Sequence, residues 1–240
     1  IKIDDLEKTY IEIENNEITK IKVNNEWIDC DDLLLGIGHS ARDTYRMLIE
    51  HKIACEPKNF AVGVRIEHTQ EFVDQCQYGQ YAKYLPAASY RLTHTTTTGR
   101  GVYTFCMCPG GEVIMATSQK GHVVTNGMSY HARNNTNANS AMLVQVTTDD
   151  IGKGIYDGMN FQEELERKAF EMGGKNYYAP IQRAIDFVNH KPTTHLGSIT
   201  PTYRLGTTYC DLHELFPGFI NQALEEGLVA FNRKMNGFLD

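Results

Sequence analysis

The stretch Val102-Tyr103-Thr104-Phe105-Cys106-Met107-Cys108-Pro109-Gly110-Gly111-Glu112-Val113-Ile114-Met115 carries the clearest fold signal in this chain. Two runs rich in β-branched and aromatic residues flank a Pro-Gly pair, and Pro followed by Gly is a turn signal. The sequence therefore predicts a β-hairpin formed by residues 102–108 and 112–118. A hairpin in the middle of the chain favours an antiparallel sheet as the centre of the fold.

Further strands and several helices are expected around this hairpin. Apolar residues that recur every three or four positions predict helices in the last third of the chain, and Pro217 is expected to break or kink the last of them. The polar stretch 130–140 is expected to be a loop. The expected strands are 60–67, 91–98, 122–125 and 141–147, and the expected helices are 69–77, 161–172, 181–188 and 211–231.

The first 54 residues differ in pattern from the rest. Residues 9–14, 17–23 and 27–28, separated by Asn-Asn pairs, predict a small antiparallel meander. The continuous apolar run 33–38 is typical of a strand buried on both faces, as in a parallel sheet. It leads into a predicted helix N-terminus, where Ser40 and Asp43 have the spacing of a capping pair. A composition shift near residues 55–58 predicts a boundary between domains 1–54 and 55–240.

The composition is that of a globular protein with a core. The chain has 240 residues, 41% of them hydrophobic and 22% charged, with a formal net charge of −7. That charge argues against nucleic acid or an anionic membrane as a partner, and no apolar run reaches the length of a membrane helix. The six cysteines and the lack of a visible export signal favour reduced thiols in a cytoplasmic protein.

Three groups of residues are candidates for chemistry. Gly36, Gly38, His39 and Ser40 lie where a strand would meet a helix N-terminus, which suits a nucleotide contact or a plain turn. The third glycine of a dinucleotide fingerprint is missing, so this is not a first nucleotide-binding loop. The pair Cys106 and Cys108, expected on one face of a strand, suits redox or metal chemistry or a simple pocket lining.

The third group is the polar segment 126–140, which suits either a solvated loop or a ligand-lining loop facing a catalytic cavity. Within it, His131 and Arg133 are the candidate catalytic residues, as a proton donor and an anion-binding cation. Asn126, Ser129, Asn139 and Ser140 are candidates for hydrogen bonds to a ligand. No metal site is predicted, because no Cys or His cluster with a ligand spacing follows the cysteine pair.

Several strings in the chain resemble one known family. The segment Gly36-Ile37-Gly38-His39-Ser40-Ala41-Arg42-Asp43-Thr44 is similar to a signature of the uncharacterised FAD-dependent dehydrogenases, also known as NAD(FAD)-utilising dehydrogenases. These are flavoproteins of the glutathione-reductase type with two domains. The resemblance extends over essentially the whole chain, through residues 60–68, 104–111, 125–133, 137–140 and 211–215.

The resemblance implies an α+β fragment of an FAD-dependent oxidoreductase that acts on a small-molecule substrate. Residues 1–54 would be a remnant of the FAD-binding α/β domain, with Gly36 to Ser40 near the adenine–pyrophosphate side. Residues 55–240 would be an antiparallel sheet with packed helices that covers the flavin from the substrate side. The main FAD-binding segments are expected outside residues 1–240, so the isolated chain is expected to be inactive and to hold no FAD. NAD(P)H is a possible reductant. The alternative is a non-catalytic module that binds a small ligand or a partner.

Overall fold

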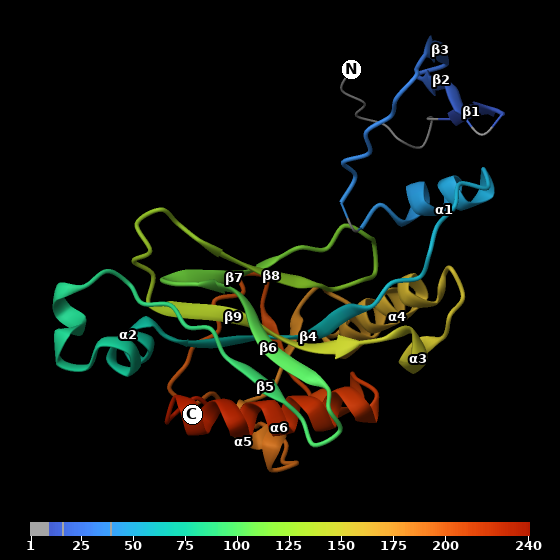
Figure 1. Cartoon of the computed structure of the whole chain (residues 1–240). Coiled ribbons are helices and arrows are strands. Elements are labelled where there is room, and N and C mark those ends of the chain that lie inside the picture. Colours follow the sequence, from blue (N-terminus) through green and yellow to red (C-terminus); the bar gives the residue numbers. More distant parts are fainter. Residues whose placement is uncertain (1–9, 16, 39) are drawn as a thin grey trace. The chain divides into compact units, whose positions relative to one another are not determined.

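The computed structural model of the chain describes residues 10–15, 17–38 and 40–240. The chain divides into two compact units, Ile1–Glu56 and Pro57–Asp240, and each is described by itself. Figure 1 labels most of the helices and strands, which are α-helices and mainly antiparallel sheets.

The first unit contains a small sheet and a helix. The strands β1 (Tyr10–Glu14), β2 (Glu17–Val23) and β3 (Glu26–Asp29) form an antiparallel sheet in the order β1-β2-β3. This confirms the predicted meander. The helix α1 (Arg42–Glu50) follows, as expected, but it begins with Ala41 at the N-cap position. Ser40 is therefore not the cap residue that its spacing from Asp43 predicts.

The predicted buried strand over residues 33–38 is wrong. Residues 32–38 belong to no helix or strand, and the side chain of Leu34 is 96% exposed within this chain. A strand of a parallel sheet needs hydrogen-bonded neighbours. The only strands described in this unit are β1, β2 and β3, which pair with one another in antiparallel order. An apolar run alone does not supply the partner strands that such a strand requires.

The second unit is built on a four-stranded antiparallel sheet in the order β4-β9-β6-β5. A separate two-stranded ribbon pairs β7 with β8, and a short parallel pair joins β10 to β11. The strands are β4 (Phe60–Thr69), β5 (Thr93–Thr95), β6 (Gly101–Cys108), β7 (Gly111–Met115), β8 (Thr125–Ser129), β9 (Asn137–Val146), β10 (Ala179–Ile181) and β11 (Thr207–Tyr209). The helices are α2 (Gln70–Tyr78), α3 (Thr148–Ile151), α4 (Asp157–Met172), α5 (Ala184–Val188) and α6 (Gly218–Lys234), with 3₁₀ turns η2 (Gly79–Tyr84) and η3 (Leu212–Glu214).

The hairpin predicted for residues 102–118 is wrong, although both of its strands and its turn exist. Both edges of β6 are occupied, because β6 pairs with β5 on one side and with β9 on the other. The chain turns at Pro109-Gly110 and leaves the sheet, and β7 then pairs with β8. A Pro-Gly turn signal fixes a local reversal but does not decide which strands pair.

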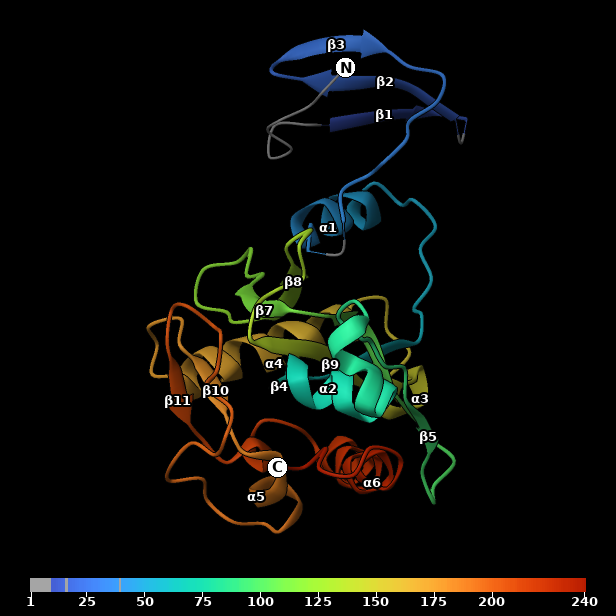
Figure 2. The ribbon, with the colours of Figure 1, turned by 90° about the vertical axis from the view of Figure 1, so that its left-hand side faces the viewer.

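The hydrophobic core lies between one face of the four-stranded sheet and helix α6 (Figure 2). Val102 of β6 and Met142 and Val144 of β9 are almost fully buried on that face, and Ile220 and Phe231 meet them from α6. Pro217 occupies the N-cap position of α6, so the predicted break at that residue is confirmed. The helix expected at residues 69–77 is α2, and the periodicity of residues 161–172 correctly predicted a helix that is part of α4. Residues 179–181, by contrast, form β10 ahead of the short helix α5.

The β7–β8 ribbon lies over the opposite face of the same sheet (Figure 1). That face is polar where β4 and β9 pair, with Arg65 opposite Ala141 and Glu67 opposite Asn139. The loop predicted for residues 130–140 ends earlier than expected, because β9 begins at Asn137. Asn137 reaches the Glu67 carboxylate through its side-chain amide (3.2 Å), so the polar residues of this strand are buried among polar partners.

Two smaller strand predictions also shift. Only residues 93–95 of the expected strand 91–98 form a strand, and the strand expected at 122–125 begins at Thr125. Among the described residues, no helix is long and apolar enough to cross a membrane.

A bidentate ion pair joins the turn between β5 and β6 to helix α3 in the second unit. The Arg100 guanidinium donates to both carboxylate oxygens of Asp150, at 2.8 and 2.6 Å, and lies 4.6 Å from the centre of the Phe219 ring. The Thr147 backbone N–H and hydroxyl also donate to that carboxylate, at 2.7 and 2.9 Å. The hydrogen bonds from Arg100 hold the pKa of Asp150 well below its usual value near 3.8.

Asp150→Asn is expected to lower the free energy of unfolding by about 2 kcal/mol at neutral pH, because it leaves the Arg100 charge half-buried without its partner. Since the native carboxyl has the lower pKa, its contribution is complete well above the unfolded-state value and is lost as the pH falls toward the native one. The difference between wild type and variant should therefore shrink between about pH 5 and about pH 2. Urea unfolding of both proteins across this range measures it, and a constant difference would contradict the assignment.

Candidate functional site

The turn between β6 and β7 is connected to helix α2 and to the segment around Ala88 by hydrogen bonds. The Gly110 N–H donates to the side-chain carbonyl of Gln70 at 2.6 Å. The side-chain amide of the same Gln70 donates to the Ala88 carbonyl (3.0 Å) and to the Asp74 carboxylate (2.7 Å). Asp74 in turn accepts the Ala88 N–H at 2.7 Å. One buried side chain of α2 thus connects the 108–111 turn with the segment that precedes Tyr90.

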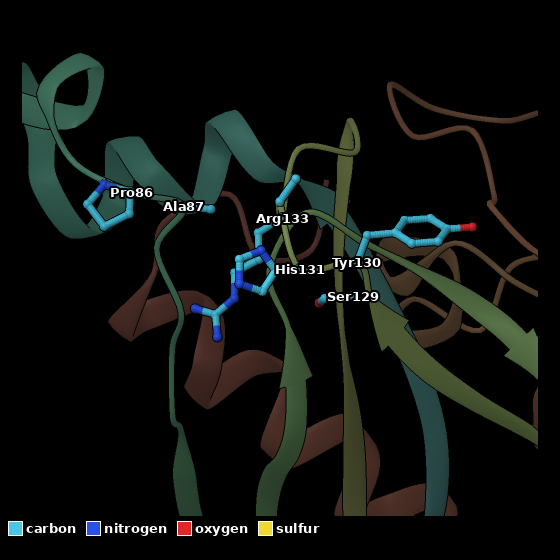
Figure 3. A pocket seen from close by; sticks show the side chains of 7 residues that line it. Pro86, Ala87, Ser129, Tyr130, His131 and Arg133 are labelled. Atoms are coloured by element: carbon cyan, nitrogen blue, oxygen red, sulfur yellow. The ribbon is translucent and has the colours of Figure 1, made fainter.

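A hollow of about 480 Å³ opens beside this turn (Figure 3). One wall is formed by Pro86 and Ala87. The next residue, Ala88, is hydrogen-bonded to the side chains of Gln70 and Asp74. The other wall is the chain from Ser129 to Arg133, at the end of β8. The Arg133 carbonyl lies so close to Gly110 that a Cβ on that glycine would overlap it. Gln70 and Gly110 therefore fix the two walls relative to each other.

Two side chains that line this hollow have no polar partner among the described residues. His131 and Arg133 are exposed, and no side-chain hydrogen bond or ion pair to either is found within the described part of the chain. By contrast, the Ser129 hydroxyl donates to the Pro109 carbonyl (2.7 Å), and the Tyr130 hydroxyl accepts a hydrogen bond from Arg204 (3.2 Å). Figure 3 shows the Tyr130 ring directed away from His131. The hollow thus presents a cation and an imidazole that are free to meet a ligand.

A buried polar cluster lies behind the turn, on the ribbon-covered face of the sheet. The Arg65 guanidinium of β4 donates to the Asn139 side-chain oxygen, to the Cys106 carbonyl (3.3 Å) and to the Cys108 sulfur (3.6 Å). A Cβ at Gly127 would overlap this guanidinium, so the absence of a side chain there makes room for it. The Arg65 Nε and the Asn139 side-chain nitrogen are buried with no hydrogen-bond partner among the described residues.

The predicted ligand contacts Asn139 and Ser140 do not face one site together. Both are fully buried, but they are neighbours in β9 and point to opposite faces of the sheet. Ser140 faces the core side, where its hydroxyl donates to the Phe105 carbonyl at 3.2 Å. Tyr90 lies near it, and burial raises the pKa of the Tyr90 phenol far above its usual value, against smaller opposite effects of Arg65 and Ser140.

The expectation that Cys106 and Cys108 share one strand face is also wrong. The register of β6 against β9 shifts between Phe105 and Cys108, and Cys106 has a positive φ of 45°. A bulge of this kind breaks the alternation of side chains on which the prediction rests. Both cysteines are free thiols, and the Cys108 thiol donates to the Cys106 carbonyl at 3.3 Å.

The remaining predicted residues lie elsewhere. Asn126 is exposed on β8, where its side-chain oxygen accepts the N–H of Gly127 at 2.8 Å, and it does not line the described hollow. Gly36, Gly38 and Ser40 belong to the first unit, and His39 lies outside the described residues.

The sequence did not point to Gln70, Asp74 or Arg65, whose side chains make the hydrogen bonds that connect the turn, the Ala88 segment and the polar cluster. Gln70 and Asp74 are spaced as an ordinary i, i+4 pair on a helix, and Arg65 lies in a strand where it alternates with apolar residues. No local pattern shows that they reach residues tens of positions away.

Comparison with known proteins finds one family and one relative of this chain. Residues 59–240 match the model of a family described as FAD-dependent protein, C-terminal domain-like. An uncharacterized protein of Clostridium beijerinckii is 45% identical over 232 residues, which cover 95% of this chain and 44% of that protein. The chain thus spans less than half the length of that relative. With the family model matching most of its length, the chain belongs to the FAD-dependent proteins, and residues 59–240 form the C-terminal-domain-like part of that family.

Proposed function

We propose that the second unit is the substrate-facing domain of a cytoplasmic FAD-dependent oxidoreductase, and that the hollow beside Ser129 to Arg133 faces the flavin and its substrate. The observation that carries this proposal is the pair of uncommitted side chains, His131 and Arg133, on a wall that Gln70 and Gly110 hold in place. Membership in an FAD-dependent family supports the cofactor. The substrate is a small molecule, and NAD(P)H is the candidate reductant.

The residues present fit an electron-rich ligand. The hollow offers a guanidinium and an imidazole, and behind it the Asn139 amide nitrogen is buried without an acceptor. Such donors suit the carbonyl-bearing edge of a flavin or a substrate carboxylate. When bound, FAD would supply the hydride or electron chemistry, and the protein would supply binding, orientation and polarity.

Each residue of the hollow would have a distinct role. Arg133 would bind and orient an anionic group, because its charge is not paired within the described chain. His131 would hold or move a proton at a ring nitrogen. The Ser129 hydroxyl already gives its proton to the Pro109 carbonyl, so toward a ligand it would act as an acceptor.

The glycine segment of the first unit does not carry this proposal. Gly36 and Gly38 lie in a stretch without a strand, so the strand–turn–helix geometry that would aim backbone N–H groups at a phosphate is missing from the described residues. Whether they contact FAD in a larger protein stays a prediction.

The proposal is tested in the whole flavoprotein of which this chain would be a part. We expect Arg133→Ala and His131→Ala to slow flavin reduction by NAD(P)H about tenfold each, since one orienting charge or proton donor is lost. Stopped-flow absorbance and the flavin redox potential provide the readouts. Arg233→Ala and His195→Ala, at exposed positions elsewhere, are the matched controls. Folded variants with unchanged rate, spectrum and potential would favour a non-catalytic binding module.

The 240-residue chain alone is expected to purify without stoichiometric FAD. Its sequence contains no three-glycine dinucleotide fingerprint, and one open hollow cannot offset the cost of ordering so large a cofactor. The visible absorbance spectrum of the purified chain measures bound flavin. One flavin per chain that survives gel filtration would show that the principal contacts lie within these residues.

A further inference from the structure

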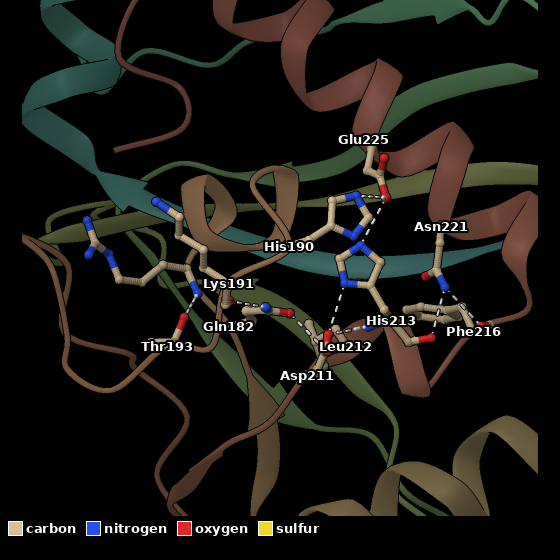
Figure 4. A network of polar contacts seen from close by, with 11 residues as sticks. Gln182, His190, Lys191, Thr193, Asp211, Leu212, His213, Phe216, Asn221 and Glu225 are labelled. Atoms are coloured by element: carbon tan, nitrogen blue, oxygen red, sulfur yellow. Dashed lines mark hydrogen bonds and ion pairs between the residues drawn. The ribbon is translucent and has the colours of Figure 1, made fainter.

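Two histidines and a glutamate converge at a place remote in sequence from the hollow (Figure 4). His190 follows α5, His213 lies in η3, and Glu225 lies on α6. The Glu225 carboxylate oxygen is 2.9 Å from Nε2 of His213 and 3.4 Å from Nε2 of His190. The ligand atoms of all three side chains lie within 4.8 Å of one another.

The two imidazole rings are arranged for a shared cation. They stack with centroids 4.4 Å apart and planes 21° apart, and both direct Nε2 toward the same carboxylate oxygen. Two protonated rings stacked in this way would repel each other, whereas two neutral rings offer two nitrogen lone pairs on the same side. Two imidazoles and a carboxylate form a ligand set that Zn²⁺ binds, at about 2.0–2.2 Å.

Further contacts hold the side chain of His213, the histidine between Asp211 and Glu225. The Asp211 carboxylate lies 2.9 Å from Nδ1 of His213 and also accepts the His213 backbone N–H at 3.0 Å. The ring of Phe187 stacks on His213 at 4.0 Å. A carboxylate on the far nitrogen of a histidine sets its tautomer, so that Nε2 is left to bind a metal.

The backbone of all three elements is also held. Asn221, one helical turn before Glu225, donates its side-chain amide to the His213 carbonyl at 2.9 Å. Gln182 joins the two histidine segments, because it donates to the Lys191 carbonyl (3.0 Å) and accepts the Leu212 N–H (2.9 Å). These hydrogen bonds hold the three segments that carry His190, His213 and Glu225 next to one another.

His190 completes the arrangement at a strained position. Its φ is +52°, in the left-handed region that non-glycine residues rarely occupy. Its side chain is 65% exposed, while those of His213 and Glu225 are 16% and 26% exposed. A cation can therefore reach the three ligand atoms from the solvent side, past His190.

We propose that His190, His213 and Glu225 form a binding site for a divalent transition metal, best suited to Zn²⁺, with Asp211 as the positioning residue for His213. The site is independent of the flavin-facing hollow, since none of these residues lines it. Sequence reasoning predicted no metal site, because the ligands come from three elements without a ligand spacing.

The test is calorimetric titration of the chelator-treated 240-residue chain with ZnCl₂ at about pH 7.5, because metal binding competes with protons for the ligand atoms. We expect one Zn²⁺ per chain. His213→Ala and His190→Asn should each weaken binding about a hundredfold or more, and Asp211→Asn about tenfold to a hundredfold. Asparagine tolerates the left-handed conformation at position 190, so that variant keeps the fold.

His195→Ala, which removes an exposed histidine outside the cluster, should leave the affinity unchanged. Wild-type chain that binds no Zn²⁺ would overturn the proposal. So would a His190→Asn variant that still binds one equivalent with wild-type affinity, since the ion would then be held elsewhere, for example by the free cysteines.

Discussion

Gly110→Ala is expected to destabilise the second unit by about 3 kcal/mol, from two effects of similar size. Gly110 has a φ of +48°, which costs an alanine about 1–2 kcal/mol. The new methyl group would also overlap the Arg133 carbonyl and carbon, which are backbone atoms and cannot rotate away. Relief would require displacing Arg133, so the wall of the hollow should move along with the loss of stability.

A matched control separates these two effects. Gly99 also has a positive φ, of 81°, but a Cβ there would meet nothing within 4 Å. Gly99→Ala should therefore cost only the conformational strain, about 1 kcal/mol. Urea unfolding of both variants measures the difference, and equal losses would mean that the loop at Arg133 yields easily.

Several of the longer helices and strands of this protein could be predicted from its sequence, because they rest on local patterns, whereas the short elements α3, β10 and β11 were missed. The meander at residues 10–29, helix α4 and the start of α6 at Pro217 all follow from such patterns. Strand pairing could not be predicted in the same way. The Pro109-Gly110 turn exists, but β9, a strand from far along the chain, occupies the edge of β6 that a hairpin would need.

The polarity of a segment did not predict whether its side chains are buried. Leu34 lies in an apolar run and is exposed, whereas Asn139 and Ser140 lie in a polar run and are fully buried. A polar side chain is costly to bury, but hydrogen bonds lower that cost when a partner such as Arg65 or the Phe105 carbonyl comes from another strand. The loop position of His131 and Arg133 could be predicted, because a polar segment that follows a strand is a local feature.

Gln70→Leu is expected to destabilise the second unit by about 3 kcal/mol and to loosen both walls of the hollow. Leucine has nearly the volume of glutamine but leaves two buried backbone groups, the Gly110 N–H and the Ala88 carbonyl, without the partner they have now. Each such group costs about 1–3 kcal/mol when it is left unsatisfied. Urea unfolding measures the loss, and hydrogen exchange at the Gly110 amide reports whether the turn opens.

Gln75→Leu, at an exposed position on the same helix, should change stability by no more than about 0.5 kcal/mol. Gln70→Glu tests the donor side of the network separately. A carboxylate can still accept the Gly110 N–H, but it cannot donate to Ala88 and would face the Asp74 carboxylate, 2.7 Å from the present amide nitrogen. We therefore expect Gln70→Glu to be destabilised at neutral pH and to recover part of the loss when acid protonates the pair. If Gln70→Leu is as stable as Gln75→Leu, then Gln70 does not hold the two walls, and the rigidity on which His131 and Arg133 depend must come from the turn alone.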